Sequence, residues 1–307
     1  MSHLFGPVPS RRLGLSLGVD LIPRKTCPYN CIYCEVGPTT RPSLKRFPYQ
    51  AQAIIGELAE YLGRPDRQVD FITLTGSGEP TLNLDLGRII GEIKSMTTTP
   101  VAVLTNGALL YLPEVRRELA AADVLLPSLD AAREETFQLI NRPLAGFSLA
   151  QLLAGLTAFR REYRGQLWLE VLLLKGVNDA EAELTALRRV LAELAPDKVQ
   201  LNTSVRPVVE NWARAPSREE MEAAAAFLGP GVEVIASFKG CARPSAALSD
   251  ADFVEMLSRR PMTAADLAKA LGLPLAVVQE KLRHLEEASL ISIYSFDKQL
   301  FYKSLCA

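Results

Sequence analysis

From residue 16 to residue 236 the chain alternates between two kinds of hydrophobic pattern. Short apolar runs rich in β-branched residues, such as VDFITLT at 69–75 and DVLLPSL at 123–129, predict strands buried on both faces. Between these runs, apolar residues recur at three- and four-residue spacing, as in 181–194, which predicts amphipathic helices. The alternation predicts βαβ units and therefore an α/β fold with a parallel sheet.

The predicted strands of this sheet are 16–22, 69–75, 101–105, 123–129, 167–174, 198–202 and 232–236. Helices are expected at 49–62, 84–95, 112–121, 133–140, 148–163, 181–194 and 218–228. About six β/α units favour a TIM-like (β/α)6 barrel or partial barrel over an open doubly-wound sheet, although the pattern alone does not fix closure. In either arrangement ligands gather at the carboxyl ends of the strands. Residues 1–15 are punctuated by Pro and Gly, and we expect them to be irregular.

The pattern changes near residue 238, which divides the chain into a barrel domain (1–238), a linker (239–250) and a small second domain (251–307). The second domain is predicted to be winged-helix-like, a form of helix-turn-helix. Its expected elements are helices at 252–257, 264–271 and 275–287 and strands at 291–294 and 299–302. Residues 249–307 hold seven Lys/Arg against eight Asp/Glu. Nucleic-acid binding needs basic charge, so packing, dimerisation or partner docking is favoured over DNA reading.

Composition limits the cellular compartments and the kinds of chemistry that fit this sequence. The chain has 307 residues, a formal net charge of −1 and 48% apolar residues. It has no apolar run of the roughly 18–20 residues that span a bilayer, and its N-terminus lacks a secretory apolar core. We therefore expect a cytoplasmic protein without a membrane partner. With two histidines in the chain, His-based nucleophilic mechanisms and His-rich metal ligation are disfavoured.

The segment CPYNCIYC places Cys27, Cys31 and Cys34 within eight positions, directly after the first predicted strand. Three thiolates on one loop form a soft-ligand site for an iron–sulfur cluster, zinc or copper(I). Three thiols leave one position of a four-iron cluster, or of a tetrahedral metal, unfilled. A structural zinc site and three unrelated thiols are the less favoured alternatives.

A basic zone surrounds this loop. Residues 1–46 carry seven Lys/Arg against two acidic residues, a net charge of +5. The zone either attracts an anionic cofactor or substrate to the loop or is ordinary solvated loop charge, and the sequence favours neither.

A CxxxCxxC motif in this position resembles the signature of the radical S-adenosylmethionine (SAM) superfamily, and the resemblance extends over residues 14–236. The longer run FGPVPSRRLGLSLGVDLIPRKTCPYNCIYC resembles a group of bacterial and archaeal iron–sulfur oxidoreductases. That group is related by similarity to the wyosine-forming, tRNA-modifying radical SAM enzymes.

The resemblance implies a [4Fe–4S] cluster held by Cys27, Cys31 and Cys34, with SAM on the remaining iron. It also implies an external one-electron reductant of the flavodoxin or ferredoxin type. One electron from the cluster would cleave SAM and release a 5′-deoxyadenosyl radical, which the protein shields from water.

The resemblance further implies a set of SAM-binding residues. Tyr33 would lie near the adenine. Gly78 and Glu79 correspond to a Gly-Gly-Glu-like segment that binds the SAM amino group, with Ser77 in place of the first glycine. Asn106 follows the third strand, where it either binds SAM or substrate or caps a turn.

Further candidate side chains end the later strands. Ser128 and Asp130 end the fourth strand, near the expected SAM ribose and carboxylate, and Asp130 could equally be a helix N-cap. Asn202 ends the sixth strand and is a SAM or substrate candidate.

Four charged positions have roles that the sequence leaves open. Glu170 interrupts the apolar strand LWLEVLLL, and a buried carboxylate is costly unless paired, so we expect a partner inside the barrel. Arg11 and Arg12 face a substrate anion or clamp the loop, and Arg206 is placed to meet an anionic substrate.

The remaining thiols, Cys241 and Cys306, are distant from the motif and from each other. A second cluster needs about four thiolates, so a second complete cluster is not expected and the wyosine analogy is weakened. The substrate is left open between a tRNA base, a small anionic metabolite and a peptide. The other function classes are an activase that docks on a partner protein through the second domain and, less favoured, a metal-dependent DNA-binding regulator.

Overall fold

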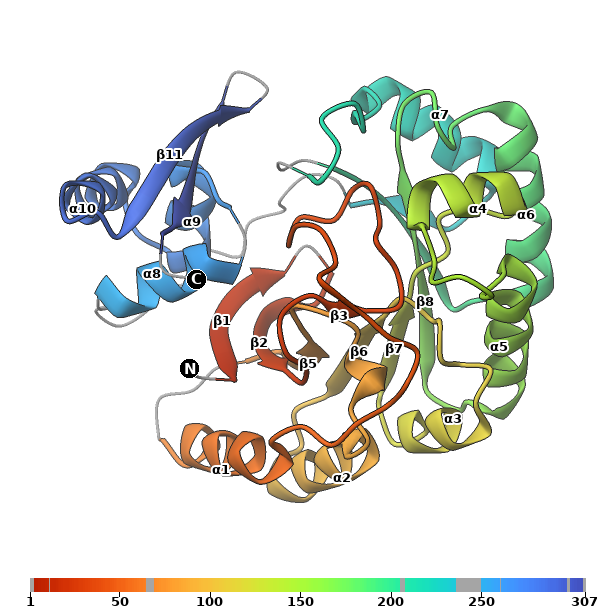
Figure 1. The fold of residues 1–307 in the computed structure, drawn as a ribbon, viewed down its shortest axis with the longest axis horizontal. Coiled ribbons are helices and arrows are strands. Elements are labelled where there is room, and N and C mark those ends of the chain that lie inside the picture. Colours follow the sequence, from red (N-terminus) through yellow and green to blue (C-terminus); the bar gives the residue numbers. More distant parts are fainter. Residues whose placement is uncertain are drawn as a thin grey trace.

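The structure is a computed structural model, and it describes residues 3–10, 12–64, 69–204, 208–235, 250–259, 261–296 and 299–305. Its centre is an eight-stranded sheet in the order β1-β2-β5-β6-β7-β8-β9-β10. Neighbouring strands from β2 to β10 pair in parallel, and β1 pairs antiparallel with β2. The sheet curls into a partial barrel with helices outside (Figure 1), and the barrel stays open between its edge strands β1 and β10. The predicted partial α/β barrel is confirmed.

The strands of this sheet are β1 (Leu4–Ser10), β2 (Gly14–Asp20), β5 (Phe71–Thr75), β6 (Val101–Thr105), β7 (Val124–Pro127), β8 (Gln166–Leu173), β9 (Lys198–Thr203) and β10 (Val232–Val234). The helices around it are α1 (Ala51–Leu62), α2 (Leu86–Met96), α3 (Pro113–Leu119), α4 (Glu134–Asn141), α5 (Leu149–Glu162), α6 (Glu181–Leu194) and α7 (Arg218–Leu228). A 3₁₀ turn, η1 (Pro80–Leu82), follows β5, and a two-residue pair joins β3 (Thr26–Cys27) to β4 (Arg41–Pro42).

The N-terminal segment differs from the expectation. Residues 1–15 were expected to be irregular, but Leu4–Ser10 forms the edge strand β1, with a register shift between Phe5 and Val8. Proline is tolerated on an edge strand because one side of that strand needs no ladder hydrogen bond. The Pro and Gly residues that predicted irregular structure are therefore compatible with this strand.

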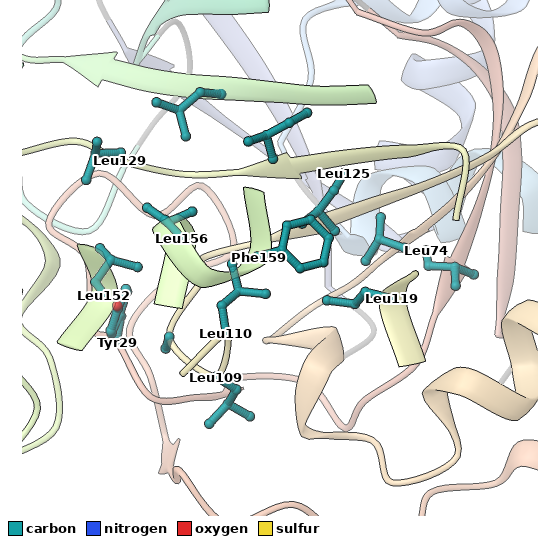
Figure 2. Close-up of a cluster of buried hydrophobic side chains, with 14 of the residues drawn as sticks. Tyr29, Leu74, Leu109, Leu110, Leu119, Leu125, Leu129, Leu152, Leu156 and Phe159 are labelled. Carbon is teal, nitrogen blue, oxygen red and sulfur yellow. The ribbon is translucent and has the colours of Figure 1, made fainter. Parts of the chain in front are cut away.

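The main core lies between the sheet and its outer helices. Figure 2 shows Leu125 of β7 near Phe159 of α5, both fully buried or nearly so. The same core extends to the thiol loop through Tyr29, whose ring contacts those of Phe137 and Phe147 edge-on or tilted. Packing of this kind anchors the loop to the hydrophobic interior.

The second domain contains α8 (Asp250–Arg259), α9 (Ala264–Leu271), α10 (Leu275–Glu287) and the antiparallel hairpin of β11 (Ile291–Phe296) and β12 (Gln299–Ser304). It has its own apolar core, which includes Leu257, Leu267 and Leu282. This order is that of the predicted winged helix-turn-helix. The domain lies beside β1 (Figure 1), and Arg24 Nη1 donates to the Ser258 carbonyl at 3.0 Å.

The proposed linker, 239–250, lies outside the described residues except for its last position. Among the helices of the described ranges, none is long and apolar enough to cross a membrane.

Candidate functional site

The thiol loop is attached to the C-terminal end of α4. The backbone N–H groups of Asn30 and Ile32 donate to the carbonyls of Asn141 and Ile140, each at 3.0 Å. The last carbonyls of a helix have no partner inside that helix. The loop supplies such partners, so α4 fixes the position of the residues around Cys31.

On its other side the loop is attached to the segment after β5. Lys25 N donates to the Ser77 carbonyl at 2.6 Å, and Glu79 N donates to the Thr26 carbonyl at 3.0 Å. A Cβ on Gly78 would lie 2.8 Å from Ile22 Cγ2 and closer still to the Thr26 carbonyl oxygen. This close approach of two backbones explains why a glycine stands at position 78.

The three thiols are free, and each accepts a hydrogen bond from one nitrogen-bearing side chain. Asn106 Nδ2 lies 3.4 Å from Cys27 Sγ, and Asn141 Nδ2 lies 3.5 Å from Cys31 Sγ. Lys25 Nζ lies 3.1 Å from Cys34 Sγ. Of these donors the sequence indicated Asn106 alone.

Burial keeps two of the thiols protonated in the metal-free protein. Burial, assisted by the nearby Glu79 carboxylate, raises the pKa of Cys27 to about 12. Burial also raises the pKa of Cys31 well above its usual value, with the Cys27 thiol as the next cause. A coordinated metal cation removes such protons outright, so these buried thiols suit a metal site. In the described part of the chain, no three His, Cys, Asp or Glu side chains surround a single ion position.

Glu79 is a buried carboxylate that organises the ends of β5 and β6. Its Oε1 accepts from Thr81 Oγ1 at 2.5 Å and from Thr105 Oγ1 at 2.6 Å, and its Oε2 accepts from Asn106 N at 2.8 Å. Burial raises the pKa of Glu79, and these hydrogen bonds oppose the rise. Glu79 therefore orients Asn106, whose amide reaches Cys27.

Asp130 is buried and accepts hydrogen bonds from three other residues, and it does not cap a helix. It accepts from Tyr33 Oη and, at 2.7 Å, from Asn141 Nδ2 through Oδ2, while Leu172 N donates to Oδ1 at 3.0 Å. Burial raises its pKa to about 6 despite the hydrogen bonds from Tyr33 and Asn141. The N-cap of α4 is Arg133, so the alternative of Asp130 as a cap is wrong.

Glu170 has the partner that its burial predicted. Arg12 Nη2 and Asn202 Nδ2 both donate to Glu170 Oε1 at 2.7 Å. Ser128 lies beside them, since it forms an isolated parallel bridge with Glu170. The Arg12 side chain is 14% exposed and that of Glu170 is 12% exposed. Arg12 thus ties the β1–β2 hairpin to β8, as the clamp alternative expected.

Three of the seven basic residues of the basic zone have structural contacts. Besides Lys25 and Arg12, the partly buried Arg46 is paired with Glu118, and it also donates to the carbonyls of Thr81 and Asn83. These three cations are engaged within the fold, whereas Arg24 and Arg41 are exposed.

One pocket connects the loop with the second domain. It is lined by Cys34 and its neighbours Glu35 to Gly37, by Arg24, and by Tyr294 and Lys303 of the β11–β12 hairpin, among others. Its volume is about 140 Å³. Cys34 is the one thiol of the motif that lines it. The candidates Arg11, Arg206, Cys241 and Cys306 lie outside the described residues.

Comparison with known proteins agrees with this architecture. The model of the Radical SAM superfamily matches residues 21–188, and that of a helix-turn-helix domain matches residues 249–293. The chain is 32% identical over 285 residues to a UPF0026 protein of Helicobacter pylori, covering 92% of this chain and 90% of that one. A structure of TYW1 with a lysine-pyruvate adduct bound has a similar fold, with a TM-score of 0.54 and 17% identity over 73% of this chain and 75% of that chain.

A further relative carries a different name. A protein called GTPase Obg of Brachyspira hyodysenteriae is 40% identical over 292 residues, which is 93% of this chain but 43% of that protein. The present chain therefore spans less than half of that relative's length. It contains no Gly-Lys pair, so the phosphate-binding GxxxxGK[ST] loop of many GTPases is absent from its sequence.

A three-thiol loop at the carboxyl ends of a partial β/α barrel, with a family match over more than half of the chain, defines a radical SAM enzyme. The chain belongs to the radical SAM superfamily, and it is similar to UPF0026 proteins. Membership implies a [4Fe–4S] cluster and SAM as cofactors.

Proposed function

We propose that this protein cleaves SAM reductively and directs the resulting 5′-deoxyadenosyl radical to a substrate that is a small anionic metabolite or a tRNA base. The observation that carries the proposal is the set of three free thiols, each hydrogen-bonded and held on one loop between β2 and α1. Cys27, Cys31 and Cys34 would hold the cluster, which supplies one electron when bound.

The chain's own residues would bind and orient SAM. Gly78 lets the backbone after β5 lie against the thiol loop. Glu79 Oε2 accepts from Asn106 N, and a carboxylate oxygen can accept a second hydrogen bond, which the SAM ammonium would donate. We assign Tyr33, Asn106, Ser128, Asp130 and Asn202 to the same cofactor pocket because they end neighbouring strands or hydrogen-bond to residues that do.

The test is product formation after anaerobic reconstitution with iron and sulfide. With SAM and a one-electron reductant, the wild-type protein should form 5′-deoxyadenosine, and Cys31→Ala should form at least tenfold less, on the order of what loss of an essential group costs. The control is Cys306→Ala, which removes a thiol outside the motif and should retain the wild-type rate. Wild-type rates in Cys31→Ala would refute the cluster assignment.

The substrate class is tested separately by filter binding. Radiolabelled tRNA and duplex DNA are compared over a salt series, since phosphate contacts give a linear fall of log affinity with log salt. We expect no binding of DNA at physiological salt, because the helix-turn-helix segment carries more acidic than basic residues. Absence of tRNA binding would leave the small anionic metabolite.

A further inference from the structure

The three donors of N–H···S hydrogen bonds come from three separate parts of the chain. Asn106 follows β6, Asn141 ends α4, and Lys25 precedes β3. Asn141 and Cys31 are 110 positions apart in the sequence. Each thiol of the motif thus has one side-chain donor, and two of the donors, Asn141 and Lys25, are not among the residues assigned above to SAM binding.

Asn141 is held so that its amide points at sulfur. It is 3% exposed, and its Nδ2 donates both to Cys31 Sγ at 3.5 Å and to Asp130 Oδ2 at 2.7 Å. Asp130 is itself fixed by Tyr33 and by the backbone of Leu172. The amide therefore has little freedom to turn away from Cys31.

Lys25 is held by its backbone. It is 7% exposed and has a φ of 59°, in the left-handed region that non-glycine residues rarely adopt. Its N–H donates to Ser77, and its carbonyl accepts from Thr40 N at 3.2 Å and Arg41 N at 3.0 Å. These bonds fix the unusual conformation, and the ammonium at the end of the side chain lies 3.1 Å from Cys34 Sγ. Burial of a lysine against a sulfur is costly unless the sulfur is anionic, as it is in a metal thiolate.

We infer that Asn141 and Lys25 are positioning residues that raise the reduction potential of the cluster. The inference rests on the proposed function, since it presumes that the three cysteines hold a cluster. Hydrogen bonds to cluster sulfurs are among the factors that set the potential. The reduced cluster carries one more electron than the oxidised one, so an N–H donor or a cation near sulfur stabilises the reduced form more. Lys25 has the larger effect because it carries a full charge.

The experiment measures the potential on protein reconstituted anaerobically, without SAM, by redox titration followed by electron paramagnetic resonance. Asn141→Leu removes the amide donor and keeps a side chain of similar volume. Lys25→Met removes the ammonium and likewise keeps a side chain of similar length. At the midpoint potential of the wild type, the ratio of reduced to oxidised cluster should be about tenfold lower in Asn141→Leu. For a one-electron couple this corresponds to a midpoint potential about 59 mV lower. Lys25→Met should shift further in the same direction.

A spectroscopic readout and a matched control accompany the titration. In resonance Raman spectra, the Fe–Sγ stretching bands should rise in frequency in both variants, and their shift in D₂O should shrink. The control, Gln138→Leu, removes an exposed amide of α4 that bonds to Glu134 and contacts no sulfur. It should leave both the potential and the bands unchanged.

The outcomes separate the inference from the proposed function. The inference is overturned if both variants have wild-type iron content and unshifted potentials. In that case, SAM cleavage by the wild-type protein still supports the proposed function. If Asn141→Leu takes up no cluster, Lys25→Met decides, and an unshifted potential there overturns the inference. A wild-type protein that takes up no cluster overturns both.

Discussion

At the residue scale, the carboxyl group of Asp130 is where four parts of the barrel meet. It joins the end of β7 to Tyr33 of the thiol loop, to Asn141 of α4 and to the backbone of β8. Because burial lifts its pKa to about 6, this carboxyl group changes charge within an experimentally convenient range.

Asp130 should therefore make the stability of the metal-free protein depend on pH. Its pKa is raised from 3.8 to about 6 on folding, so the stabilisation is complete below pH 3.8 and is lost as the pH rises through 6. The free energy of unfolding should fall between pH 4 and pH 7 in the wild type, and in Asp130→Asn this fall should be smaller by about 2–3 kcal/mol. Urea unfolding at a series of pH values measures this. An unchanged slope would show that Asp130 does not carry the titration.

At the element scale, regular elements were predictable and long-range contacts were not. The helix 181–194 and the strand 101–105 have the predicted bounds because their periodicity is local. Ser148 caps α5 with a capping box, a signal that four neighbouring residues contain. The prediction of irregular structure for residues 1–15 is wrong at β1 because Pro and Gly, which are typical of loops, occur in this edge strand.

The candidate site follows the same division. The three cysteines are adjacent in sequence and could be found there. The donor to Cys31 lies 110 positions away, and the partner of Glu170 lies 158 positions away. Nothing local distinguishes Asn141 from other amides at helix ends, so the fold alone reveals its role.

Two glycines test how tightly the loop meets β5. In Gly78→Ala, the new methyl group would press on Thr26 and Ile22, and we expect a destabilisation of about 1–3 kcal/mol with reduced iron uptake. In Gly91→Ala, on the exposed side of α2, nothing lies within 4 Å of the new atom, so a gain of about 0.5–1 kcal/mol is expected. Urea midpoints and iron assays of both variants provide the measurement. Equal behaviour of the two would contradict the close backbone contact.

At the scale of the whole molecule, the second domain is a neighbour of the site. Its helices α8 and α9 contact β1, and its hairpin contributes Tyr294 and Lys303 to the pocket beside Cys34. The acidic balance of this domain predicts packing or docking rather than DNA reading, and filter binding of duplex DNA tests this prediction.

The pocket beside Cys34 has a consequence for chemical attack on the metal-free protein. Burial raises the pKa of Cys27 and Cys31 and so keeps both thiols protonated, and a protonated thiol is a poor nucleophile. Cys34 opens to the pocket, so a small electrophile such as iodoacetamide should label it first, several-fold faster than the other two. Mass spectrometry of timed digests would reveal the order, and preferential labelling of Cys31 would contradict it. The same opening makes Cys34 the thiol at which an invading oxidant would first meet the motif, so damage by air should begin on the side that the second domain covers.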